Sequence, residues 1–98
     1  MTATKIANVP TTSGSRHLQQ LCKHWGHKMP VEFTPEQGTI TFPSGVVTTM
    51  TAFPEHLEVR LDLPDANMAE QMQGVVQRHL DRFAFREAPL SFDWRDVE

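Results

Sequence analysis

The clearest pattern in the chain is a strict alternation of apolar and charged residues over positions 57–63. Leucine or valine occupies every second position, between Glu58, Arg60 and Asp62. This period of two is typical of a β-strand with one buried and one solvated face. Pro10 ends an earlier alternating segment and favours an edge position for it. Alternating or β-branched runs between proline- and glycine-containing turns predict strands over residues 4–9, 31–34, 39–42, 46–53, 57–63 and 90–95.

Two other segments repeat their apolar residues with helical spacing. Over residues 15–27, Leu18, Leu21, Cys22 and Trp25 form the i, i+3, i+4, i+7 stripe of a half-buried helix. A second helix is predicted to begin after Asp65, because aspartate is a favoured N-cap residue. Its predicted apolar face consists of Met68, Met72, Val75, Val76 and Phe83.

The predicted elements follow one another in the order β-α-β-β-β-β-α-β. Short turns between the middle strands favour antiparallel neighbours, and each helix has a single apolar stripe to bury. We therefore expect a two-layer α+β sandwich, in which a largely antiparallel sheet carries both helices on one face. The length of 98 residues suits a single domain that spans residues 1–98. The second face of the sheet is predicted to be polar, and it could pair two copies in a homodimer.

Charge and composition exclude several classes of partner. The net charge is −3 and no run of Lys or Arg is present, which argues against nucleic-acid binding. The chain has no apolar stretch of membrane length, and its first residues lack a hydrophobic signal core. A single cysteine cannot form an intramolecular disulfide. These features predict a cytoplasmic protein with no membrane partner.

Three of the five histidines and the only cysteine lie between Arg16 and Lys28. On a helix, Cys22 and His24 are about 200° apart, so they cannot bind one metal ion. Cys22 is predicted to be a buried structural thiol. His24 and His27, spaced i and i+3, could share a zinc or iron ion if another segment or subunit supplied a further ligand. The alternative is a solvated polar surface with a mild response to pH.

His79 is a second candidate, because it falls near the middle of the apolar face predicted for the second helix. Burial there would favour the neutral imidazole and could suit it to acid–base chemistry. A small enzyme with His79 as general base would need a partly apolar cavity that reaches this residue. The alternative is a core histidine that is hydrogen-bonded to a backbone carbonyl. Farther along, Arg82, Arg86 and Glu87 could bind an anion or cap the end of the helix.

Three blocks of this sequence stand out together: Arg16 to Phe33, Gly38 to Pro43 with Gly45, and His79 to Glu87. In this order they resemble a bacterial family of small proteins known as domain of unknown function 2218. The resemblance implies membership in the family and no defined activity. It also implies a loose association with genes for siderophore and iron uptake. Many members resemble one another in carrying a tyrosine where this chain has His17, which leaves His24, His27, Lys28 and His79 as the stronger site positions.

In this family-based interpretation, the ends of the two helices lie side by side. His24, His27 and Lys28 would then form one polar surface with Arg86 and Glu87. We expect a small cytoplasmic binding or accessory domain for a small ligand or a protein, linked to iron or siderophore handling through that surface. Two other interpretations stay open, which are a small enzyme based on His79 and a structural or oligomerisation module.

Overall fold

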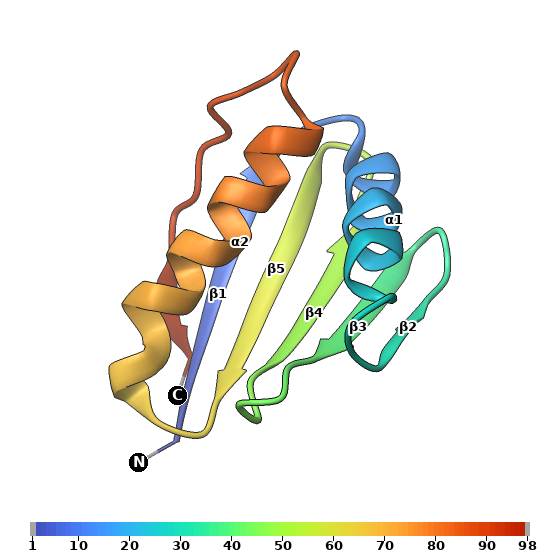
Figure 1. Ribbon diagram of the computed structural model, residues 1–98. Coiled ribbons are helices and arrows are strands. Elements are labelled where there is room, and N and C mark those ends of the chain that lie inside the picture. Colours follow the sequence, from blue (N-terminus) through green and yellow to red (C-terminus); the bar gives the residue numbers. More distant parts are fainter. Residues whose placement is uncertain (1, 98) are drawn as a thin grey trace.

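The computed structural model describes residues 2–97 and shows a six-stranded antiparallel sheet with two helices on one face (Figure 1). The helices are α1 (Gly14–Trp25) and α2 (Ala69–Phe83), and a short 3-10 helix, η1 (Ala66–Met68), precedes α2. The predicted α+β sandwich and the order β-α-β-β-β-β-α-β are confirmed. The strands are β1 (Ala3–Pro10), β2 (Val31–Phe33), β3 (Gln37–Thr41), β4 (Val47–Ala52), β5 (His56–Leu63) and β6 (Arg95–Val97).

The strands lie in the order β2-β3-β4-β5-β1-β6. Strands β2 to β5 form a meander, and β1 pairs along its whole length with β5, from Ala3 opposite Leu63 to Pro10 opposite His56. The edge position predicted for the first strand is therefore wrong, since β6 pairs with residues 4–6 on its outer side. Pro10 is still tolerated, because β6 does not extend to the second half of β1.

The core lies between the sheet and the helices. The α1 stripe of Leu18, Leu21, Cys22 and Trp25 is buried as predicted. The helix can approach β3 closely only because position 38 is glycine, since a Cβ there would lie 2.5 Å from Cys22 Sγ. The strands contribute every second side chain to this core, including Val9, Ile40, Met50, Leu57, Val59 and Leu61.

The face that α2 buries differs from the predicted one. Its buried residues are Ala69, Met72, Val76 and Leu80. The prediction that His79 lies near the middle of the apolar face is wrong, because Leu80 is one position and about 100° away and is buried completely. Packing Leu80 into the core turns the half-buried flank of α2 toward α1. That flank carries Val75, His79 and Phe83.

The last strand is also shorter and later than predicted. Residues 90–94 belong to no strand, and β6 begins at Arg95. The alternation there reflects real burial, since Leu90 is buried and Trp94 is half-buried. Side chains of α2 hold this segment, because Asp81 accepts a hydrogen bond from the Leu90 backbone N–H at 2.9 Å and Gln77 accepts one from the Trp94 indole at 2.8 Å.

The two helices run antiparallel across the sheet, so the start of α1 lies beside the end of α2 (Figure 1). This orientation follows from the topology. Each helix returns across the sheet after a strand, α1 after β1 and α2 after β5, and these two strands are antiparallel neighbours. No helix among residues 2–97 combines the length and the apolar character that a membrane span requires.

Candidate functional site

The antiparallel helices divide the surface that was predicted from the sequence. His24, His27 and Lys28 lie at and just beyond the last turn of α1, whereas Glu87 contacts the first turn of that helix. The last turns of the two helices do touch, since the ring centre of His24 lies 5.6 Å from that of Phe83. Arg86 and Glu87 lie beyond that contact, at the start of α1, so the expectation that they neighbour the end of α1 is wrong. The predicted residues fall instead into two clusters along the seam between α1 and α2.

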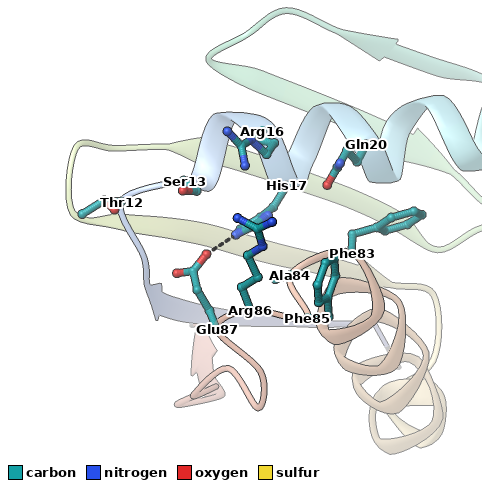
Figure 2. A pocket seen from close by; sticks show the side chains of 10 residues that line it. All are labelled: Thr12, Ser13, Arg16, His17, Gln20, Phe83, Ala84, Phe85, Arg86 and Glu87. Carbon is teal, nitrogen blue, oxygen red and sulfur yellow. Dashed lines mark hydrogen bonds and ion pairs between the residues drawn. The ribbon is translucent and has the colours of Figure 1, made fainter.

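The first cluster surrounds a cavity of about 510 Å³ between the start of α1 and the segment that follows α2 (Figure 2). The start of α1 contributes polar side chains, the last residue of α2 contributes Phe83, and the segment after α2 contributes Phe85 and a pair of opposite charges. Arg86 and Glu87, predicted as site residues, both line it. The lining residues are Thr12, Ser13, Arg16, His17, Gln20, Phe83, Ala84, Phe85, Arg86 and Glu87.

Glu87 is held in place by two hydrogen bonds. Thr11 Oγ1 donates to Oε1 at 2.6 Å, and His17 Nε2 lies 2.7 Å from Oε2. The hydrogen bond from Thr11 and then that from His17 hold the pKa of the Glu87 carboxyl below its usual value. Because Glu87 is therefore ionised, His17 Nε2 carries a proton and donates it. Both carboxylate oxygens are thus already engaged.

His17 is the cavity residue that the resemblance had placed in doubt. It is only 3% exposed, and its Nδ1 is buried without a hydrogen-bond partner in the part of the chain that the structure describes. Its partner Glu87 is 70 positions away in the chain. No local pattern predicts such a pair. The only sequence signal was the position of His17 beside the apolar stripe of the first helix.

Arg16 and Arg86 are the exposed cationic side chains of the cavity. Neither forms an ion pair with a carboxylate of residues 2–97. Figure 2 shows Arg86 extending from the segment after α2 toward α1. Its guanidinium carbon lies 5.9 Å from the ring centre of Phe85, within the range of a cation–π contact. The cavity therefore carries a net positive charge.

The first turn of α1 adds to this positive potential. Ser13 occupies the N-cap position without a capping hydrogen bond from its side chain, and the first turn contains no acidic residue. The first N–H groups of a helix have no intrahelical partner and carry a partial positive charge. Since Ser13 and Arg16 both line the cavity, this helix end supports the two arginines.

The second cluster lies farther along the seam and joins His24 to α2. The ring centres of His24 and His79 are 5.6 Å apart, and His79 also lies 4.8 Å from the ring of Trp25. Nδ1 of His79 donates to the Val75 carbonyl at 2.7 Å. The backbone hydrogen bond matches the structural alternative for His79.

The electrostatic surroundings of His24 are uniformly basic. Partial burial lowers the pKa of His24, and the charges of His79, Lys28, Arg82 and His27 lower it further, in that order. No carboxylate contributes to this shift. The neutral imidazole is therefore favoured at neutral pH, although the side chain is only half-buried.

Among residues 2–97, the structure assembles neither a metal site nor the His79 cavity that the enzyme hypothesis requires. Within residues 2–97, no group of three His, Cys, Asp or Glu side chains is placed to hold a metal ion, so a site on His24 and His27 stays a two-residue prediction. Cys22 is buried, and burial raises the pKa of its thiol to about 11. The cavity is not lined by His79, so it is not the cavity that the enzyme hypothesis requires.

Comparison with known proteins identifies relatives over nearly the whole chain. Residues 6–95 match a family described as "Uncharacterized protein conserved in bacteria (DUF2218)". The NMR structure of PA4090 from Pseudomonas aeruginosa is 39% identical, covers 95% of this chain and 95% of that chain, and superposes with a TM-score of 0.78. No curated protein matches.

Proposed function

The chain belongs to the DUF2218 family of uncharacterised bacterial proteins, and because that membership supplies no activity we propose a function from the cavity itself. The protein is a binding domain that holds a small anionic ligand between the start of α1 and the segment after α2. This proposal narrows the binding role expected from the sequence to a defined place and a defined charge.

The observation that carries the proposal is the pair of arginines without a carboxylate partner. Arg16 and Arg86 both line the cavity, and its one carboxylate, Glu87, already accepts hydrogen bonds on both oxygens. A guanidinium group presents a planar set of donors that matches a carboxylate or a phosphate. An anion in this cavity would accept hydrogen bonds from two exposed guanidinium groups that form no ion pair within residues 2–97.

The remaining walls favour an anion with an apolar body. Phe83 and Phe85 line the cavity beside the arginines. Phe85 is 71% exposed, which is the highest exposure of any large hydrophobic side chain in the described part of the chain. A flat apolar group could cover these rings and remove them from water. The expected ligand class is therefore a small carboxylate or phosphate with an aromatic or aliphatic body.

The other roles expected from the sequence stay predictions. A link to iron or siderophore handling would name a context for the ligand, but the arrangement of His24 and His27 does not select a metal over a solvated surface. A homodimer through the polar face of the sheet is likewise untested, and light scattering would measure it directly. Neither role is needed for anion binding in the cavity.

Titration of the protein with benzoate and with inorganic phosphate, followed by NMR chemical shifts, tests the proposal. Arg86→Gln and Arg16→Gln should each weaken benzoate binding by about tenfold, because each removes a charged hydrogen-bond donor. Arg78→Gln is the matched control, since it removes the same charge from an exposed position of α2 outside the cavity. Absence of saturable shifts at millimolar concentrations of both anions, or equal weakening by the control, would overturn the proposal.

A further inference from the structure

The basic surface continues along the seam between α1 and α2, beyond the cavity. Arg16, Gln20 and His24 follow one another at intervals of four residues, so they lie on one flank of α1. Phe83 lines the cavity, and its ring centre is also 5.6 Å from that of His24. The wall of the cavity is therefore in contact with the second cluster, and the two clusters form one continuous surface.

The helical layer is basic although the whole chain is acidic. Residues 14–28 and 66–87 hold six of the nine Lys and Arg residues but only three of the twelve Asp and Glu residues. Two of these three acids are engaged, because Asp81 accepts from the Leu90 backbone and Glu87 from Thr11 and His17. The helical layer is therefore positively charged although the net charge of the whole chain is −3, and the net charge alone did not predict this.

We propose that the ligand carries two anionic groups at opposite ends of a flat apolar body, with one group at Arg16 and Arg86 and the other beside His24. This inference rests on the proposed function, because it extends the same site along the seam. Arg16 and His24 are eight positions apart, which is a rise of about 12 Å along the helix. An elongated dianion therefore fits the two positions, whereas a compact one reaches only the first.

Binding of the second anionic group is coupled to a proton. The charges that act on His24 come from His27 and Lys28 beyond the end of α1 and from His79 and Arg82 of α2, and the His79 ring lies 5.6 Å away. All of them are basic, so they oppose the charged form of His24 in the free protein. An anionic group placed beside His24 would favour that charged form. The ligand should then bring in a proton, and its affinity should rise as the pH falls toward 6.

The test compares biphenyl-4,4′-dicarboxylate with biphenyl-4-carboxylate, which share one body and differ by one charge. Calorimetric titrations at about pH 8 and about pH 5.5 would use the wild type and His24→Gln. His56→Gln is the control, since His56 stacks on Phe53 and does not line the cavity. In the wild type, the dicarboxylate should bind roughly tenfold more tightly than the monocarboxylate at the lower pH, and the ratio should fall to about two at the higher pH. His24→Gln should keep the low ratio at both pH values, whereas the control should behave as the wild type.

The outcomes separate this inference from the proposed function. Suppose that Arg86→Gln weakens the binding of both compounds, but the ratio of their affinities depends neither on pH nor on His24. The elongated dianion is then wrong, and the anion site stands. If Arg86→Gln has no effect on either compound, the anion site itself is wrong. A ratio that persists in His24→Gln would also overturn the inference.

Discussion

Glu87 and His17 lie 70 positions apart in the chain and are joined by a hydrogen bond of 2.7 Å between Oε2 and Nε2. With Thr11, which donates to the other oxygen, they tie the end of β1, the first turn of α1 and the segment after α2 into one unit. The contact fixes the position of Arg86, the preceding residue, at the cavity. It is therefore both a structural link and a support for the proposed site.

Replacing Glu87 with glutamine should lower the free energy of unfolding at pH 7 by about 1 kcal/mol, since it weakens two hydrogen bonds to a charged group. The pKa of Glu87 is lowered in the folded state from its ordinary value of 4.5. The stabilisation is therefore present above that value and is lost as the pH falls through the lower folded pKa. Urea unfolding of the wild type and Glu87→Gln at pH 7 and near pH 3 would measure the difference in the free energy of unfolding at each pH.

The same measurement on Glu36→Gln is the control, because Glu36 is exposed and its side chain has no hydrogen bond within residues 2–97. A difference between wild type and Glu87→Gln that persists undiminished at the lower pH would contradict the linkage. The control variant should differ little from the wild type at either pH.

Gly38→Ala should destabilise the protein, because the new Cβ would lie 2.5 Å from the buried Cys22 Sγ. Overpacking of this kind costs about 1–3 kcal/mol. The same change in a Cys22→Ala background should cost less, since the sulfur that blocks the Cβ is gone. Urea unfolding of the wild type, both single variants and the double variant would give the coupling energy. An equal cost in both backgrounds would show that Cys22 is not what excludes a side chain at position 38.

His24 should make the folded protein less stable in mild acid. Its pKa is lowered from 6.5 in the folded state, so the unfolded chain binds the proton first as the pH falls. Stability should therefore decline as the pH falls through 6.5 toward the folded pKa, and no such loss is present above that window. Thermal unfolding at several values from pH 8 to pH 5 should show a smaller decline for His24→Gln than for the wild type. Equal declines for the two proteins would rule out this role.

The Cys22 thiol should be inert in the folded protein. It is buried, and burial raises its pKa to about 11, so little thiolate forms near neutral pH. A disulfide reagent such as dithionitrobenzoate at pH 8 should react slowly with the native protein and rapidly in denaturing urea. Fast reaction without urea would show that the α1–β3 interface opens readily.

Local periodicity was enough to determine the elements of this protein and their order. The α1 stripe and the alternation in β5 each record which side chains face the core, and that information lies within a few residues. The two-layer architecture followed, because every element had one apolar face to bury. Residues Arg86 and Glu87 could also be singled out as charged groups that follow a helix.

Only the tertiary structure decided which residues meet. The pairing of β1 with β5 sets the helices antiparallel, and this places Glu87 at His17 rather than near His27 and Lys28. Burial of Leu80 turns His79 from the core toward His24. Neither outcome leaves a local pattern, because strand order and helix rotation depend on packing between segments that are distant in the chain. The cavity and its two arginines are products of that packing.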